Sequence, residues 1–465
     1  MLRFTALSLI AFLCLLGPSL RSQDDPKPKA AAHRLVLVTE PKVFHACEVT
    51  VAINPTKPDH IIGVSQQVPT NVAYASTDGG KSWTSVRLAN PDKRIQGDDA
   101  ITFTADGLAV RTYISFSGIR IPRPTRAVNG IFVSTSRDGL FSSARGGIYW
   151  NDPVPVIDHI NSVTPFEDKP WIRADTSKES PHKGNIYIAW TKFDVYGSKD
   201  PEHKSHIYFS RSKNGGKSFS PAHRISQTPG DCLDKSTTVE GAVPMIGPKG
   251  EVYVIWAGAK GLVFVKSTDG GFSFGKEKHV TETPGAWDFA VKGIMRCNGM
   301  PIGCVDLSDG PNRGTLYVNW ADLRNGDPDI FLMSSKDGGE TWTKPMRVND
   351  DPKGNGKEQF FTWMAVDPVD GAVNIVFFDR RDTEGTKTAV ILARSVDGGK
   401  TFVNHKINQE PFRCDMSAFF GDYIGIDAHG GRVVTMWQHF TAPGRLAISA
   451  ALFDFKRGTQ ETQAP

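Results

Sequence analysis

Beyond its N-terminus this sequence has no long apolar run, and no segment approaches the roughly 20 uninterrupted apolar residues that a membrane-spanning helix requires. It also lacks an excess of charge, because 54 lysines and arginines are balanced by 50 aspartates and glutamates, for a net charge of +4. Charges of both signs are interspersed, so there is no basic patch of the kind that binds nucleic acid. We therefore expect no membrane span and no nucleic-acid partner.

Clustered metal ligands are missing as well. The sequence contains no Cys-x-x-Cys pair and no closely spaced histidines, so we expect no zinc site, and we predict neither a metal nor another cofactor. Five cysteines follow the N-terminal segment: Cys47, Cys232, Cys297, Cys304 and Cys414. An odd number leaves at least one without an intramolecular partner. A Cys47–Cys414 bridge would join the first and last repeated units described below, and Cys297 with Cys232 or Cys304 is the second candidate pair.

Residues 1–22 have the features of a secretory signal peptide, since an apolar run from Leu7 to Leu16 follows Arg3 and small residues after it offer cleavage points. The protein is therefore predicted to be secreted or periplasmic, and we expect a monomer. The predicted organisation is a signal peptide at 1–22, a short disordered leader at 23–32, one β-rich domain at 33–455 and a C-terminal tail at 456–465.

A short motif, Ser-x-Asp-Gly-Gly followed three residues later by an aromatic residue, recurs along the chain. Aspartate and glycine in this order predict a hairpin turn, because the aspartate side chain binds nearby backbone amides and glycine supplies the positive φ that the turn needs. We interpret the motif as a structural turn and not as a catalytic element. Its acidic or amide residue falls at Asp78, Asp138 (a degenerate copy), Asn214, Asp269, Asp337 and Asp397.

This pattern resembles the Asp-box, or BNR, repeat of sialidases, sortilin-like receptors and several other secreted β-propellers. The resemblance covers nearly the whole chain after the leader and implies one blade per repeat, with insertions confined to loops. The segments 378–382 and 420–425 are similar to those of bacterial secreted proteins called sialidase-like from their repeats, whose activity is mostly inferred.

The strand pattern predicts seven blades. The last unit has no motif copy and lacks an outer strand, which residues 33–38 can supply, pairing the two ends of the chain and removing exposed strand edges. We therefore predict an all-β, seven-bladed Asp-box β-propeller closed by the N-terminal strand, with a six-bladed sialidase-type propeller as the alternative. Seven runs have the pattern of a second blade strand: 61–64, 109–112, 186–190, 252–256, 316–320, 373–377 and 433–437.

Functional residues are expected on one face of such a propeller. Loops that lead into the inner strands share a face with loops that leave the second strands, whereas the motif turns lie on the opposite face. Convergence of polar groups at the first face is the expected position of a site. Carboxylates, arginines and aromatic residues concentrate in these loops: Glu48, Asp98, Asp99, Asp168, Trp171, Glu240, Arg296, Arg324, Asp379, Arg380, Arg381, Asp422 and Tyr423.

The resemblance to sialidases implies roles for these residues. Tyr423 would be the nucleophile with Glu240 accepting its proton, and Asp98 or Asp99 would be the general acid. The implied function is a secreted exo-glycosidase that acts on an acidic or other terminal sugar of extracellular glycans or glycoproteins. Arginine side chains offer a planar fork that matches a carboxylate. The predicted substrate-binding residues are Arg296, Arg324, Arg380, Arg381, Asp168, Asp379, Asp422 and Trp171.

Other functions remain open. A non-catalytic propeller would present the same face to a glycan or a protein. A polysaccharide lyase or an endo-acting hydrolase would use paired carboxylates such as Asp98 and Asp168. Sialidases carry an Arg-Ile-Pro segment ahead of their first motif, whereas Arg120-Ile121-Pro122 follows it here.

Structural interpretations of single residues also remain open. Tyr423 is consistent with an inner-strand aromatic whose hydroxyl binds a backbone carbonyl. Asp379 and Arg381 are consistent with an ion pair between blades. The acidic loop 325–329 offers oxygen ligands for calcium, although such loops are common.

Overall fold

The computed structural model describes residues 32–39, 46–67, 70–89, 93–119, 126–137 and 149–455, which belong to one compact unit, Ala30–Thr459. These residues form strands and turns and contain no α-helix. Consequently, no helix in the described part of the chain is long and apolar enough to cross a membrane. The predicted signal peptide, the Arg120-Ile121-Pro122 segment, the motif copy at Asp138 and the tail at 456–465 lie outside the described residues.

Seven antiparallel sheets repeat the same four-stranded order. The first four sheets are β2 (Cys47–Ile53), β3 (Ile61–Gln66), β4 (Val72–Ser76) and β5 (Thr84–Arg87); β6 (Ile95–Phe103), β7 (Ala109–Ser117), β8 (Val128–Ser136) and β9 (Val154–Ile160); β10 (Phe166–Ala174), β11 (Ile186–Phe193), β12 (Ser205–Ser212) and β13 (His223–Arg224); and β14 (Glu240–Ile246), β15 (Val252–Gly258), β16 (Gly261–Ser267) and β17 (Lys278–Thr281).

The last three sheets continue the pattern, with short pairings added at two loops. Strands β18 (Asp288–Phe289) and β19 (Cys297–Asn298) pair with each other, and β28 (Phe412–Arg413) pairs with β26. The sheets are β20 (Ile302–Val305), β21 (Leu316–Asp322), β22 (Asp329–Ser335) and β23 (Met346–Arg347); β24 (Gln359–Val366), β25 (Val373–Asp379), β26 (Lys387–Ser395) and β27 (Val403–Lys406); and β29 (Gly425–His429), β30 (Arg432–Ala442), β31 (Arg445–Asp454) and β1 (His33–Leu37).

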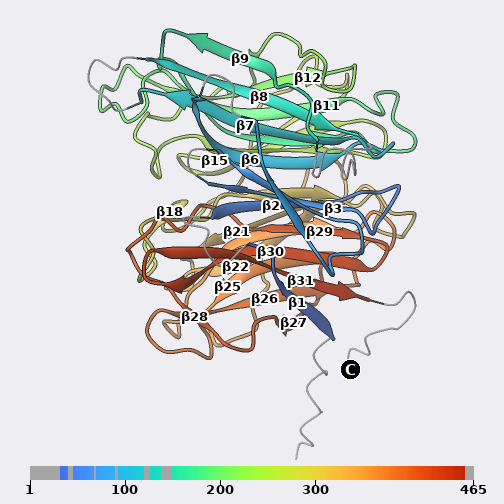
Figure 1. Ribbon diagram of the computed structural model, residues 1–465, viewed down its shortest axis with the longest axis vertical. Coiled ribbons are helices and arrows are strands. Elements are labelled where there is room, and N and C mark those ends of the chain that lie inside the picture. The colour runs from blue at the N-terminus through green and yellow to red at the C-terminus, as the bar shows by residue number, and fades with distance from the viewer. Residues whose placement is uncertain are drawn as a thin grey trace, which may run out of the picture. The chain divides into compact units, whose positions relative to one another are not determined.

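The sheets close into a ring. The first strands β2, β6, β10, β14, β20, β24 and β29 contact one another in this order, and β29 contacts β2 again. Strand β1 pairs with β31 from His33 opposite Phe453 to Leu37 opposite Ser449, and Figure 1 shows the blue first strand beside the red last one. The seven-bladed propeller closed by its N-terminal strand is confirmed, and the six-bladed alternative is excluded.

The Ser-x-Asp turns join the third and fourth strands of their blades. Ser335, the last residue of β22, donates from Oγ to Asp337 Oδ1 at 2.8 Å and accepts from Gly339 N at 2.9 Å. Asp337 Oδ1 also accepts the amides of Glu340 and Thr341 at 3.0 and 2.9 Å. Hydrogen bonds from Thr341 and Ser335 hold the pKa of Asp337 below its ordinary value. The Ser335 and Asp337 side chains of this motif copy therefore form hydrogen bonds within the turn, in agreement with the interpretation of the motif as a structural turn.

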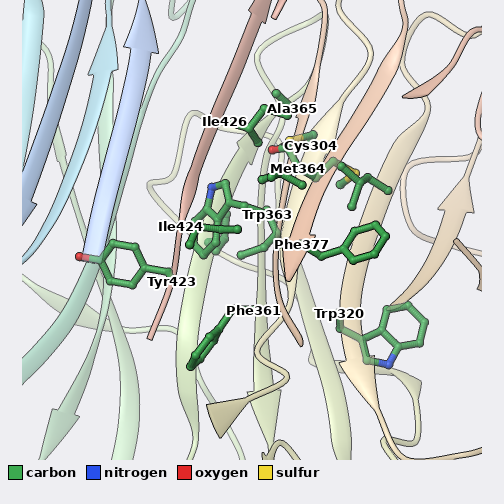
Figure 2. Packing of buried hydrophobic residues seen from close by; sticks show 14 of the residues in the cluster. Cys304, Trp320, Phe361, Trp363, Met364, Ala365, Phe377, Tyr423, Ile424 and Ile426 are labelled. Carbon is green, nitrogen blue, oxygen red and sulfur yellow. Dashed lines mark hydrogen bonds between the residues drawn. The ribbon is translucent and has the colours of Figure 1, made fainter. Parts of the chain in front are cut away.

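Aromatic packing joins neighbouring blades. Figure 2 shows part of the core, where Trp363 and Tyr423 approach each other near the first strands while Trp320 and Phe377 lie on second strands. The second-strand tryptophans are fully buried, so they act in packing and not in sugar stacking. They occupy equivalent positions at Trp190, Trp256, Trp320 and Trp437.

All five cysteines in the described residues are buried free thiols. The predicted Cys47–Cys414 bridge is therefore wrong, and Cys297 pairs with neither Cys232 nor Cys304. Cys47 lies beside Glu48 and Asp422 at the start of β2, whereas Cys414 Sγ lies 3.4 Å from Thr388 Oγ1 of β26. Strand pairing between β1 and β31 closes the ring in place of a covalent bond.

Candidate active site on the propeller axis

Five of the first strands begin with the same irregularity. Strands β2, β6, β10, β14 and β24 each have a register shift near their first residues, where the chain forms a bulge. Four of the five residues with positive φ there are not glycine, and this conformation costs an L-residue about 1–2 kcal/mol. Bulges re-aim side chains, and backbone strain concentrates at functional sites. The five residues with positive φ at these bulges are Glu48, Asp98, Lys169, Gly241 and Phe361.

Acidic side chains gather at these bulges around two cations. Arg296 donates from Nε to Asp422 Oδ1 at 2.9 Å and from Nη1 to Asp234 Oδ2 at 3.0 Å, and its Nη2 also contacts Asp422. The group lies on the face where the first strands begin, opposite the motif turns. We call it the axial cluster; its members are Glu48, Asp98, Asp168, Asp234, Glu240, Asp422, Lys169 and Arg296.

Lys169 is the second cation of the axial cluster. Its Nζ lies 3.9 Å from Asp98 Oδ1 and 4.0 Å from the centre of the Tyr423 ring, and 10% of its side chain is exposed. The ammonium has no hydrogen-bond partner among the described residues. It borders a cavity of about 20 Å³ that also touches Asn298 and Asp422, which is room for one water molecule. Lys169 therefore acts on the carboxyl groups mainly through its field.

Two contacts between carboxyl groups organise the axial cluster, and the first joins Glu48 to Asp422. Burial, followed by the charges of Asp98 and Asp422, raises the pKa of Glu48 well above its ordinary value. Burial acts in the same direction on Asp422, but Arg296 overcomes it and lowers the pKa of Asp422. The opposite pKa shifts give Glu48 the higher proton affinity of this contacting pair.

The second contact joins Asp168 to Asp98. Burial and the charges of Asp98 and Asp234 raise the pKa of Asp168 well above its ordinary value. Burial also raises the pKa of Asp98, although Lys169 opposes the rise. The pKa of Glu240 is raised in the same way, first by burial and then by the charges of Asp234 and Asp168. The axial cluster therefore holds carboxyl groups of unequal proton affinity side by side, the arrangement that general acid–base catalysis uses.

Tyr423 lies beneath the axial cluster in an aromatic layer. Its ring packs 5.6 Å from Trp171 and 5.7 Å from Trp363, and the two tryptophan rings are 4.4 Å apart. Its hydroxyl points away from Trp363 in Figure 2 and donates to the backbone carbonyl of Asp99 at 3.0 Å. We call Trp171, Trp363 and Tyr423 the aromatic septum.

The structure does not bring Tyr423 and Glu240 together. The acidic groups that act on the Tyr423 hydroxyl are Glu48, Asp98 and Asp99, and burial is the main reason why the pKa of Tyr423 lies well above its ordinary value. Asp99 itself is fully buried against Arg111, at 2.9 Å. Burial raises the pKa of Asp99 to about 6 in spite of that arginine.

The four arginines expected to bind an anion lie in separate ion pairs. They share no carboxylate partner among the described residues, so the structure does not gather them into one clamp. Only Arg296 belongs to the axial cluster, and 45% of its side chain is exposed. The partners are Asp422 for Arg296, Asp322 for Arg324, Glu358 for Arg380, and Asp379 for Arg381.

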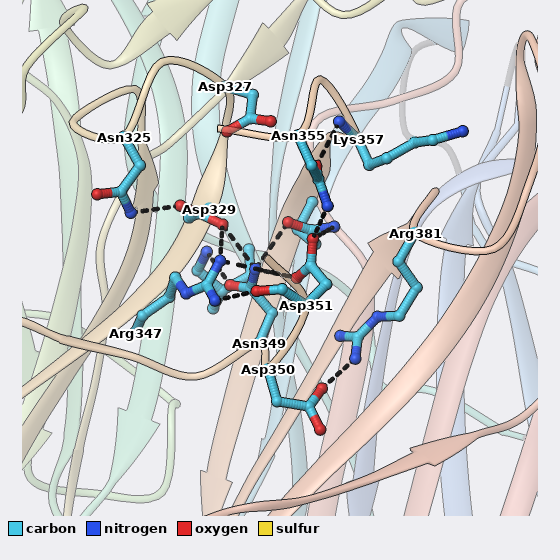
Figure 3. Close-up of polar contacts among 12 residues, drawn as sticks. Asn325, Asp327, Asp329, Arg347, Asn349, Asp350, Asp351, Asn355, Lys357 and Arg381 are labelled. Atoms are coloured by element: carbon cyan, nitrogen blue, oxygen red, sulfur yellow. Dashed lines mark hydrogen bonds and ion pairs between the residues drawn. The ribbon is translucent and has the colours of Figure 1, made fainter. Parts of the chain in front are cut away.

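A polar network connects the fifth and sixth sheets on the same face (Figure 3). Asp329 Oδ1 accepts from Arg347 Nη1 at 3.2 Å and from Asn349 Nδ2 at 2.6 Å, and Asp327 Oδ2 accepts from Gly356 N at 2.6 Å. These carboxylates of loop 325–329 are thus bound by protein donors. Within the described ranges no group of three or more His, Cys, Asp or Glu side chains is arranged to hold a metal ion.

Three members of the axial cluster, Glu48, Lys169 and Asp234, were not predicted as site residues. Glu48 was expected only to lie on this face, and Lys169 lies between the predicted residues Asp168 and Trp171. Both are recognisable once the bulge is seen, because each is the residue with positive φ. Asp234 precedes β14 in a long loop and accepts the Tyr196 hydroxyl at 2.5 Å, and no sequence signal distinguishes it.

No protein-family model and no curated protein matches this sequence. Among solved structures, an ulvan lyase of a polysaccharide lyase family is similar with a TM-score of 0.51 and 12% identity, over 89% of this chain and 95% of that chain. An α-L-arabinanase from Penicillium chrysogenum has a TM-score of 0.46 and 11% identity, over 92% and 99%. A Hadza microbial sialidase has a TM-score of 0.46 and 16% identity, over 85% of this chain and 73% of that chain. At 12% identity the likeness to the lyase shows the fold alone, and the two structures with TM-scores below 0.5 add nothing to it.

Proposed function

We propose that this protein is a secreted glycoside hydrolase built on an Asp-box propeller, which removes a terminal sugar from extracellular glycans. The observation that supports this is the contact between carboxyl groups of unequal proton affinity, Glu48 with Asp422 and Asp168 with Asp98, beside strained bulges on the axis. Export rests on the signal-peptide pattern of residues 1–22, and the Asp-box assignment on the repeated turns.

Asp168 and Asp98 are the pair that meets substrate. Asp168 is half-buried and 14% of the Asp98 side chain is exposed, whereas Glu48 and Asp422 are 2% and 6% exposed. Asp168 gives its proton to the glycosidic oxygen as the bond to the sugar breaks. Asp98 contacts Asp168 in this structure, so the bound sugar must separate the two carboxyl groups to about 6.5–9.5 Å before Asp98 takes a proton from the attacking water, whose oxygen bonds to the anomeric carbon. The more buried pair, Glu48 and Asp422, maintains the charge balance around Asp168 and Asp98.

The charge of the axial cluster favours a neutral sugar. Six carboxyl groups surround two cations, and Arg296 is already bound by two of the carboxylates. A sialic acid carboxylate would meet like charges and no free guanidinium there, which is a strong ground for rejection. This differs from the arginine-clamp mechanism that the sialidase resemblance implies.

Turnover of a panel of 4-nitrophenyl glycosides, with 4-methylumbelliferyl sialoside included, tests the proposal. We expect hydrolysis of at least one neutral glycoside and a loss of about 10²–10⁴ in kcat for Asp168→Asn and for Asp98→Asn. Asp194→Asn is the matched control, because Asp194 lies on the same face and only accepts the Lys204 amide at 3.0 Å. Tyr423→Phe should retain turnover; its complete loss, or preference for the sialoside, would restore the tyrosine mechanism.

A non-catalytic glycan-binding propeller is the second candidate. The burial of Glu48, Glu240 and Asp422 favours it, since groups 2–6% exposed present little surface to a substrate. Absence of turnover on the whole panel, with glycan binding that survives Asp168→Asn, would favour this function over hydrolysis.

A further inference from the structure

A second and larger cavity lies at the other end of the axis. It has a volume of about 450 Å³ and is lined by the final residues of all seven first strands, on the face of the motif turns. Trp171 and Trp363 border both this cavity and the small one beside Lys169. The aromatic septum therefore separates it from the axial cluster. Its volume falls within the range of small-molecule sites, about 300–1,000 Å³.

This cavity is basic where the axial cluster is acidic. Its lining includes Arg173, Lys178, Lys183 and Arg313 but only two carboxylates. Of these, Asp309 is paired with Lys178 at 3.1 Å and with Arg313 at 3.5 Å. The cationic excess therefore persists after the ion pairs are formed.

Arg173 is a cation of this cavity that no group in the described residues binds directly, although its charge acts on Asp427. Its side chain projects from β10 next to the septum, and it forms no hydrogen bond and no ion pair with any described residue. The other carboxylate, Asp427, is bound by backbone amides, at 2.7 Å by Ile53 N and at 2.9 Å by Ala428 N. The Arg173 guanidinium thus keeps a planar set of donors free inside a concave site, which matches two oxygens of one anion.

The walls around Arg173 are largely apolar. Val51, Ile101, Met245, Met364 and Ile426 come from five different first strands and line the cavity. Such walls favour a ligand with a hydrophobic body, while the guanidinium fixes the orientation of its charged end.

We propose that this cavity is a second binding site, for a small organic acid whose carboxylate faces Arg173 and whose apolar body packs against these walls. The site is independent of the proposed hydrolysis, because the septum separates the two compartments. Its occupancy is measured directly and needs no turnover.

Isothermal titration calorimetry of the full chain with 2-naphthoate and with its neutral isostere 2-naphthamide tests the proposal. We expect 2-naphthoate to bind at least about tenfold more tightly, since charge-assisted hydrogen bonds are lost in the amide. Arg173→Gln should remove this difference by weakening the naphthoate alone, and Arg173→Lys should restore part of it because charge returns without the planar fork. Arg224→Gln is the matched control, since Arg224 is an exposed arginine on the outer strand β13.

Three results would overturn the proposal: equal affinity for both compounds, naphthoate affinity unchanged by Arg173→Gln, or no naphthoate binding to the wild-type protein. Thermal midpoints of the variants show whether they are folded. The wild-type comparison of acid and amide decides the question even if a variant unfolds.

Discussion

Lys169→Met is the sharpest perturbation of the axial cluster, because methionine keeps the side-chain length and removes the charge. At the 3.9 Å that separates Nζ from Asp98 Oδ1, two unit charges interact by about 4 kcal/mol at an effective dielectric constant of 20. Part of this is offset in the wild type by the cost of burying the ammonium. We therefore expect the free energy of unfolding to fall by about 2–4 kcal/mol at pH 8.

The effect of Lys169→Met depends on pH with a definite sign. The pKa values of Glu48, Asp168 and Glu240 are raised in the folded protein, so it keeps protons that the unfolded chain releases above about pH 4. The stability contributed by these groups is therefore greatest in acid and falls as the pH rises through the raised values. Lys169 opposes these rises, and without it the fall with pH becomes steeper. The variant should therefore lose more at pH 8 than at pH 5, where the attraction to carboxylates that are already ionised, such as Asp422, is still lost.

Urea unfolding followed by tryptophan fluorescence at pH 5 and pH 8 measures this. Lys192→Met is the matched control, because Lys192 Nζ also lies over a tyrosine ring, 4.8 Å from the centre of Tyr208, but outside the axial cluster. Equal losses at the two pH values, or equal losses in the two variants, would refute the electrostatic role of Lys169.

Three further predictions concern the turns and the two ends of the axis. Gly339→Ala places a methyl group against the Phe264 ring, whereas Gly356 also has a left-handed φ but has open space around it, so urea unfolding should show a loss about 1–3 kcal/mol larger for Gly339→Ala than for Gly356→Ala. Asp397→Ala removes hydrogen bonds to the Lys400 and Thr401 amides and should cost about 1 kcal/mol at neutral pH. The pKa of Asp397 is lowered in the folded protein, so this cost should disappear as the pH falls below about 4. Added salt should weaken 2-naphthoate binding and leave neutral-glycoside turnover unchanged, as parallel titrations would show.

The blade count was predictable because each blade repeats local signals. Every complete motif begins at the last residue of the third strand of its blade. The seven runs predicted as second strands fall within β3, β7, β11, β15, β21, β25 and β30. The missing outer strand of the last unit also predicted the pairing of β1 with β31. Disulfide pairing was not predictable in this way, because neighbouring blades leave Cys47 and Cys414 in different surroundings.

The sequence predicted on which face of the propeller the site lies, but not how its residues are arranged there. Strand order places the relevant loops together, but the contacts within that face depend on side-chain direction. Arg324 and Arg381 turn back to aspartates two positions earlier in the chain, Asp322 and Asp379, and so leave the axis. The bulges in which Glu48, Asp98 and Lys169 adopt a positive φ have no sequence signature, since none of these residues is glycine.

The opposite charges at the two ends of the axis have a common origin in this bulge. Five of the seven first strands start with a bulge, which directs acidic residues such as Asp98 and Asp168 inward; β10 then resumes regular pleating, which brings Arg173 inward beyond the septum. Packed aromatic rings keep the two sets of charges from neutralising each other across the septum. An anion is therefore repelled at one end and attracted at the other, so the neutral sugar and the organic acid that we propose are selected by the same strand geometry.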